Sequence, residues 1–219
     1  MCCRPNEPEP GNTGGGKKVE KTSNQSNKLY NSNTKFPTQI ITEIAIFAAL
    51  SAVLYSIRIF TLPYGGSITL ASMVPVMWLS IRRGVRVGII TGTIFGGIAL
   101  FIDVLYLGAS AVVASPLQAV LEYPVALGLI GLTGLFTGLF QKKTVGLALV
   151  GASLAVFLRF LDHYFVGVFV WYYVYAFPSG YDQWIWPAIY NGSFLIVEFI
   201  ISAVVLVVLI NRGTLDYRL

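Results

Sequence analysis

The chain alternates long apolar stretches with short polar breaks, a pattern typical of helices that cross a membrane. The apolar segments run over residues 38–60, 67–82, 85–107, 111–140, 145–174 and 185–211. A spanning helix needs about 20 mostly apolar residues, and the second segment, with about 16, is the short one. The segments do not alternate apolar and polar positions as β-barrel strands would. We therefore predict an all-α integral membrane protein with six transmembrane helices.

Composition separates a polar tail from this membrane domain. The 219 residues are 55% hydrophobic and 11% charged, with a mean hydropathy of +0.71, whereas a soluble domain has roughly 25% charged residues. Residues 1–35 are rich in Pro, Gly, Asn and Lys and have little to bury, which predicts a disordered cytoplasmic tail. Residues 36–219 are predicted to form one transmembrane domain. Cys2 and Cys3 are adjacent and cannot form a disulfide framework.

The basic residues predict the orientation in the membrane. With the N-terminus inside, all of the 15 lysines and arginines except Arg58 and Arg159 lie on the cytoplasmic side. Cytoplasmic loops carry such an excess, so we predict that both ends are inside (N-in, C-in). The positive net charge is then a signal of topology, and no nucleic-acid partner is expected.

A near-match to a phosphate-binding loop lies in the tail. Gly11–Lys18 reads GNTGGGKK, but Lys18 stands where the loop needs a Ser or Thr for magnesium. The required strand before it and helix after it are also missing from the pattern. If ATP drives this protein, we expect another chain to hydrolyse it.

Several polar residues lie within the apolar segments and are candidates for a binding site: Glu122, Arg159, Asp162, His163, Asn191 and Glu198. An ionisable group at bilayer depth costs about 2.5–3.5 kcal/mol or more, so such groups normally face a cavity or a partner. At 1.5 Å per residue, Glu122, His163 and Asn191 lie roughly 16, 15 and 9 Å below the outer surface. This shared depth predicts a pocket that opens outward. Two structural alternatives remain open: Asp162 could pair with Arg159, and Glu198 could be a packing partner.

The residue types in this set indicate the chemistry of a ligand. The Glu122 carboxylate, with Trp171 and Trp186 nearby, suits a flat cationic heteroaromatic molecule through charge pairing and cation–π contact. His163 and Asn191 can donate to and accept from ring nitrogens. The sequence contains neither an H-E-x-x-H nor a G-x-S-x-G motif. We therefore expect a binding protein rather than an enzyme, with no cofactor and no metal.

Small residues mark two helix faces. Gly88, Gly92 and Gly96 form a stripe that lets backbones approach closely, and Ala45 and Ala49 form a small-x-x-x-small pair on a helix with no pocket candidate. The alanine pair either packs inside the protein or forms a docking face for another membrane protein, and the pattern alone leaves both open.

Four stretches resemble the thiamine-specific S-component of energy-coupling factor (ECF) transporters: TEIAIFAAL (Thr42–Leu50), PVMWLSIRRG (Pro75–Gly84), LEYPVALGLIGLTGLF (Leu121–Phe136) and the run Arg159–Gly192. The resemblance covers about residues 36–211. It implies a six-helix, multi-pass S-component in the cell membrane that binds thiamine in an outward-facing pocket. It also implies as partners a membrane coupling subunit and two cytoplasmic ATPase subunits.

The resemblance also assigns residues. It implies substrate contacts by Glu122, Tyr123, His163, Trp171 and Asn191, with Trp171 stacked on the aminopyrimidine ring. It implies that Ala45 and Ala49 contact the coupling subunit, which favours the docking face. Three positions depart from the family pattern: Trp186 stands for a Tyr, Gly66 for a first-loop Trp and Arg159 for a Lys. A related pyrimidine or thiazole compound is the alternative to thiamine.

Three functions remain as hypotheses. The first is the thiamine-binding subunit of an ATP-dependent vitamin importer. The second is a stand-alone transporter of thiamine or a thiamine precursor, proton-coupled through Glu122, Asp162 or Glu198. The third is a membrane-embedded enzyme or assembly scaffold. A need for partner ATPases would separate the first from the second, and tight binding of unmodified ligand would argue against the third.

Overall fold

The computed structural model describes residues 38–174 and 182–213, and residues from Ile40 onward form one compact unit. The predicted tail, residues 1–35, lies outside the described residues. Within the described part, five helical spans are long and apolar enough to cross a membrane. These spans are Thr38–Ser56, Val85–Leu107, Pro116–Leu139, Val145–Val174 and Ile185–Asn211. The prediction of a helical, multi-pass membrane protein is confirmed at this level.

The described residues form the following elements, in chain order. They are α2 (Thr38–Ser56), β1 (Arg58–Thr61), η1 (Pro63–Gly65), β2 (Ser67–Thr69), α3 (Val74–Arg83), α4 (Val85–Leu107), α5 (Ala109–Val112), α6 (Pro116–Val120), η2 (Leu121–Val125), α7 (Ala126–Leu129), η3 (Ile130–Gly134), α8 (Leu135–Leu139), α9 (Val145–Val166), η4 (Gly167–Trp171), α10 (Tyr172–Val174) and α11 (Ile185–Asn211). η2 and η4 are π-helical turns, whereas η1 and η3 are 3₁₀ turns.

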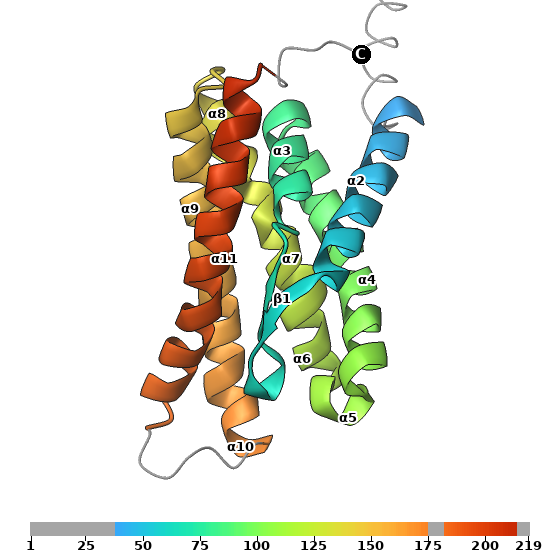
Figure 1. Ribbon diagram of the computed structural model, residues 1–219, viewed down its shortest axis with the longest axis vertical. Coiled ribbons are helices and arrows are strands. Elements are labelled where there is room, and N and C mark those ends of the chain that lie inside the picture. The colour runs from blue at the N-terminus through green and yellow to red at the C-terminus, as the bar shows by residue number, and fades with distance from the viewer. Residues whose placement is uncertain (1–37, 175–181, 214–219) are drawn as a thin grey trace, which may run out of the picture. The chain divides into compact units, whose positions relative to one another are not determined.

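The second predicted segment, 67–82, is not a long helix. Its first residues form β2, which pairs antiparallel with β1, and a helix begins at Val74, with Pro75 in its first turn. Proline lacks an N–H and fits the start of a helix better than its interior. Figure 1 shows the β1–β2 hairpin filling the half of the bundle that the short α3 does not reach. The hairpin therefore forms part of the wall at that end.

The ends of the helices follow the predicted topology. Figure 1 shows α2 beginning and α11 ending at one end of the bundle, where the α3–α4 and α8–α9 turns also lie. The hairpin, α5 and α10 lie at the opposite end. The two basic turns, with Arg82, Arg83 and Arg86 and with Lys142 and Lys143, thus share one end. That this end faces the cytoplasm remains a prediction.

The glycine stripe on α4 packs against the irregular span that follows α5. A Cβ atom at Gly92 would meet the backbone of Leu127, and one at Gly96 would lie 2.7 Å from the Cα of Pro124. Close packing of two backbones requires the missing side chains, as predicted for this stripe. The contact at Gly96 matters most for function, because it holds α4 against the π-turn η2.

We expect Gly96→Ala to destabilise the protein and to displace η2. The added Cβ overlaps the Tyr123 carbonyl group, and such overpacking costs about 1–3 kcal/mol. The matched control is Gly97→Ala, because a Cβ atom there has no neighbour within 4 Å. Thermal unfolding of the detergent-solubilised variants measures the difference. Equal melting temperatures for Gly96→Ala and wild type would contradict the close packing of α4 on η2.

Candidate functional site

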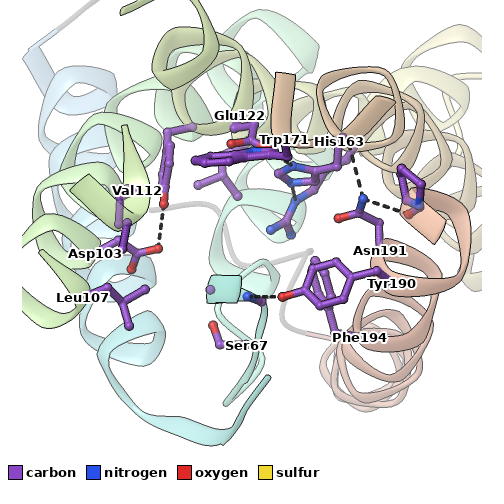
Figure 2. A pocket seen from close by; sticks show the side chains of 18 of the residues that line it. Ser67, Asp103, Leu107, Val112, Glu122, His163, Trp171, Tyr190, Asn191 and Phe194 are labelled. Carbon is purple, nitrogen blue, oxygen red and sulfur yellow. Dashed lines mark hydrogen bonds and ion pairs between the residues drawn. The ribbon is translucent and has the colours of Figure 1, made fainter. Parts of the chain in front are cut away.

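A cavity of about 110 Å³ lies among the hairpin, α4, η2, α9 and α11. One water molecule needs roughly 10–15 Å³, so this space admits a small molecule. All six predicted substrate-binding residues line it: Glu122, Tyr123, His163, Trp171, Trp186 and Asn191. Figure 2 shows Glu122, Trp171 and His163 along one side, with Asp103 and Leu107 to one flank and Asn191, Tyr190 and Phe194 to the other.

Glu122 is carried by a π-turn that contains a proline. Pro124 has no N–H to donate and clashes with the preceding turn of a regular helix. The chain accommodates it in the wider turn η2, and such π-bulges occur frequently at functional sites. The carboxylate is therefore held by a local irregularity that its own sequence, L-E-Y-P-V, imposes.

The Glu122 carboxylate is bound by uncharged donors. Its Oε1 accepts a hydrogen bond from the Trp171 indole N–H at 2.7 Å, and its Oε2 accepts one from the Gln118 amide. His163 Nδ1 lies 3.7 Å from the same Oε1. Among the described residues, no lysine or arginine forms an ion pair with Glu122. The cavity therefore has a carboxylate whose charge is left for a ligand.

His163 is oriented by its neighbour one turn earlier on α9. Arg159 Nε donates to His163 Nε2 at 3.4 Å, which makes Nε2 the acceptor nitrogen of the ring. In the neutral imidazole the proton is then on Nδ1, the nitrogen that faces Glu122. His163 can thus present an N–H to the Glu122 carboxylate or to a ligand atom in the cavity.

Four residues spaced four apart along α9 and η4 reach the cavity. Arg159, His163, Gly167 and Trp171 all line it. A spacing of four drifts around a regular helix of 3.6 residues per turn, but the wide π-turn η4 offsets that drift before Trp171. Gly167 also lets α11 approach, since a Cβ there would lie 2.7 Å from Pro187 Cβ.

Asn191 offers its oxygen to the cavity. Its Nδ2 donates to the carbonyl of Pro187 at 2.9 Å and to that of His163 at 3.3 Å, so the amide nitrogen is engaged by the protein. Figure 2 shows the amide oxygen pointing away from these carbonyls into the open space. A ligand amino group could donate to this oxygen.

Several cavity residues were not predicted from the sequence, and Tyr190 and Asp103 are the two that form polar contacts described below. Tyr190 lines the cavity, stacks on Trp186 with ring centroids 6.3 Å apart, and accepts a hydrogen bond at 2.8 Å from the N–H of Gly66. Its hydroxyl also donates to the Pro63 carbonyl, so Tyr190 links the tip of the hairpin to α11.

Asp103 lines the opposite flank and accepts a hydrogen bond from Tyr123. Asp103 lies one turn before the end of its apolar segment. A charged residue so close to the end of a span is easily taken for part of the following loop, which is why the sequence did not indicate it.

Two polar residues of the predicted set do not line the cavity. Glu198 is 1% exposed and lies beyond the cavity, two turns along α11 from Asn191, where it pairs with Arg159 at 3.3 Å and accepts from Thr69. Of the two structural alternatives, the one that made Glu198 a packing partner thus describes this residue.

The other alternative paired Asp162 with Arg159. Asp162 is not at hydrogen-bond distance from Arg159 in the described part of the chain, and its Oδ2 is buried without a hydrogen-bond partner there. It lies beside His163 in sequence and therefore on another face of α9.

The alanine pair lies on the outside of the bundle. Ala45 and Ala49 are exposed, whereas Ala48 and Ala52 face the core. The bundle therefore does not use this pair for packing among its described residues. The sequence offered no pocket candidate on this helix, but Tyr55 near the end of α2 lines the cavity.

Among the residues that the structure describes, no group of three His, Cys, Asp or Glu side chains could hold a metal ion. The polar atoms around the cavity instead suit an organic cation with hydrogen-bonding ring substituents. A carboxylate, aromatic faces and an amide oxygen converge from three spans.

Comparisons with known proteins identify the family of the chain. A model of the family described as thiamine transporter protein (Thia_YuaJ) matches residues 41–215. The chain is 34% identical to thiamine transporter ThiT of Bacillus subtilis over 177 residues, covering 76% of this chain and 88% of that protein. It is 32% identical to ThiT of Lacticaseibacillus paracasei over 186 residues, covering 78% and 87%.

A solved structure has a similar fold. The structure of ThiT from Listeria monocytogenes superimposes with a TM-score of 0.66 at 26% identity, covering 81% of this chain and 97% of that one. The resemblance drawn from the four sequence stretches is confirmed by these matches.

Proposed function

The chain belongs to the thiamine transporter protein (Thia_YuaJ) family, and on that premise we propose that it is the thiamine-binding S-component of an ECF-type importer in the cell membrane. Thiamine enters the cavity from the outer side, and partner subunits hydrolyse ATP. The observation that carries the proposal is the Glu122 carboxylate, which lines the cavity and has the His163 imidazole at 3.7 Å but no lysine or arginine partner among the described residues.

The charges around the cavity support a monocationic ligand. Arg58 pairs with Asp103 and Arg159 pairs with Glu198, so each of these carboxylates has its own counter-charge. Glu122 remains, and thiamine brings one permanent positive charge on its thiazolium ring. A buried charge is costly unless it is paired, so the ligand would supply the missing partner.

The uncharged groups support an aminopyrimidine in the same cavity. Trp171 and Trp186 provide aromatic faces, and an offset-stacked pair contributes about 0.5–1.5 kcal/mol beyond its buried area. The Asn191 oxygen accepts from an exocyclic amino group, and His163 reaches a ring nitrogen. The family pattern has a Tyr where this chain has Trp186. Tyr190 lies one turn further along α11, but its hydroxyl is engaged by Gly66 and Pro63 of the hairpin.

The exposed alanines support a partner at α2. A second membrane helix approaches closely where small side chains line the surface. Ala45 and Ala49 are exposed on α2, and the flanking Ile46 and Leu50 are exposed as well. We assign this face to the membrane coupling subunit, with two ATPase subunits beneath it.

The alternative function is a stand-alone, proton-coupled transporter, and an uptake assay separates it from the proposal. Of its three candidate proton carriers, Glu122 lines the cavity, whereas Glu198 is ion-paired and Asp162 lies outside the lining. Uptake into proteoliposomes should require the coupling subunit and both ATPases as well as internal ATP. Uptake by the purified chain alone, driven by a proton gradient, would refute the proposal and favour the alternative.

We expect Glu122→Gln to weaken thiamine binding by about 1.5–3 kcal/mol, the range for hydrogen bonds to charged groups. Isothermal titration calorimetry on the purified protein measures it. Glu43→Gln is the matched control, because Glu43 pairs with Arg83 away from the cavity and should bind thiamine like wild type. Unchanged affinity in Glu122→Gln would remove this carboxylate from the site.

We expect Trp171→Ala to lose affinity and most of the ligand-induced quenching of tryptophan fluorescence, because the stacked ring is gone. Trp186→Ala should cost less. The control is Trp184→Ala, since Trp184 is 51% exposed and does not line the cavity. Normal binding and quenching in folded Trp171→Ala would mean that this ring is an interfacial residue.

We expect Ala45→Trp or Ala49→Trp to abolish ATP-dependent uptake while thiamine binding stays nearly intact. A large side chain on this face holds a partner helix away. Val150→Trp is the control, because it adds the same bulk to an exposed position on α9. Both quantities are measured on the same preparation of each variant. Normal uptake with either tryptophan on α2 would refute the docking face, and lost binding would mean that the alanines pack internally.

A further inference from the structure

Asp103 is a buried carboxylate at the cavity whose oxygens are both occupied. It is 2% exposed and lies one turn before the end of α4. Its Oδ2 accepts from the Tyr123 hydroxyl at 2.8 Å and from the Tyr55 hydroxyl at 2.9 Å. Its Oδ1 pairs with Arg58. These donors come from η2, α2 and β1, so one carboxylate joins three elements to α4.

The occupied oxygens argue against a direct role in holding a ligand. A carboxylate has about four lone-pair positions, and three donors already point at Asp103. Tyr123 and Tyr55 line the cavity, whereas Arg58 does not. The Arg58 side chain is about as buried as that of Asp103, at 8% against 4% exposed. Asp103 therefore acts on the cavity through its neighbours.

The first effect is on the shape of the wall. Tyr123, on η2, and Asp103, on α4, both line the cavity and are joined by the hydrogen bond from the Tyr123 hydroxyl. The hydrogen bond to a charged acceptor fixes the direction of the hydroxyl and with it the plane of the ring. Tyr123 follows Glu122 in the chain, so the same bond also restrains the π-turn that carries the Glu122 carboxylate.

The second effect is on charge. Arg58 lies on β1, at the base of the hairpin whose tip lines the cavity. Without Asp103, the guanidinium would be an uncompensated positive charge near a site that takes a cation. Removing one partner of a buried ion pair leaves the other charge unpaired, which costs more than the pair itself contributes.

We propose that Asp103 is a positioning residue of the thiamine site, which orients Tyr123 and neutralises Arg58 so that Glu122 is the charge presented to the ligand. This inference rests on the proposed function, because it takes thiamine as the ligand of the cavity. Asp103 would act through Tyr123 and Arg58 without touching the ligand, a role that the sequence pattern does not indicate.

The test is thiamine titration of wild type, Asp103→Asn, Arg58→Gln/Asp103→Asn and Tyr123→Phe. Asp103→Asn should lower affinity about tenfold or more, because it leaves the Arg58 charge unpaired. The double variant removes both charges and should recover most of that loss. Tyr123→Phe keeps the ion pair and should lower affinity severalfold. Thr91→Val, whose buried hydroxyl bonds within α4, is the control and should bind like wild type.

The outcomes are distinct. A purely structural Asp103 would make the double variant bind no better than Asp103→Asn, and that result would overturn the inference. Affinity within twofold of wild type in folded Asp103→Asn would overturn it too. If Asp103→Asn does not fold, unchanged affinity in Tyr123→Phe would overturn it. Failure of wild type itself to bind thiamine would refute the proposed function, and this inference with it.

Discussion

The arrangement of the cavity follows from the cost of holding a charge where water is scarce. A carboxylate or guanidinium at such a depth needs a counter-charge or several hydrogen-bond donors. Asp103 and Glu198 each have an arginine, on β1 and α9 respectively, and these two pairs tie the hairpin and α11 to the rest of the bundle. Glu122 has neutral donors and the imidazole of His163. The proposed affinity for a cation depends on this difference.

The regular helix is broken where the cavity forms. The turn at η2 widens at Pro124, the turn at η4 widens before Trp171, and a hairpin replaces half a span before α3. These irregularities direct Glu122 and Trp171 toward each other, with 2.7 Å between Glu122 Oε1 and Trp171 Nε1. Non-helical backbone at membrane depth is tolerated where it is buried in protein or lines a cavity. Gly65, Gly66 and Ser67 at the tip of the hairpin line the cavity, whereas most of β1 is exposed.

Much of this site was predictable because helical spacing carries information about faces. Arg159, His163 and Trp171 recur every four or eight residues, and the structure brings all three to the cavity with Asn191 from the next span. The long apolar runs likewise predicted the spans around them. Glu122 was prominent because a lone carboxylate in an apolar run has few structural explanations.

The remaining features could not be predicted because they depend on contacts between distant elements. The run 67–82 is apolar enough for a helix, and its strand forms because β1 pairs with it and Tyr190 binds the hairpin tip from α11. Asp103 and Arg58 are 45 residues apart in the chain, so the sequence does not reveal that they form a buried ion pair beside the cavity. Glu198 shares a helix face with Asn191, but it lies two turns further along α11. Asn191 therefore lines the cavity and Glu198 does not.

The most direct measurement of the central claim is a crystal structure of this protein with thiamine bound. We expect the ligand to lie in the cavity, with a positively charged or protonated ring of thiamine within about 4 Å of the Glu122 carboxylate, an ion-pair distance. Its aminopyrimidine should lie against Trp171, with the amino group at the Asn191 oxygen. Thiamine bound elsewhere, or bound in the cavity with no cationic atom near Glu122, would contradict the claim.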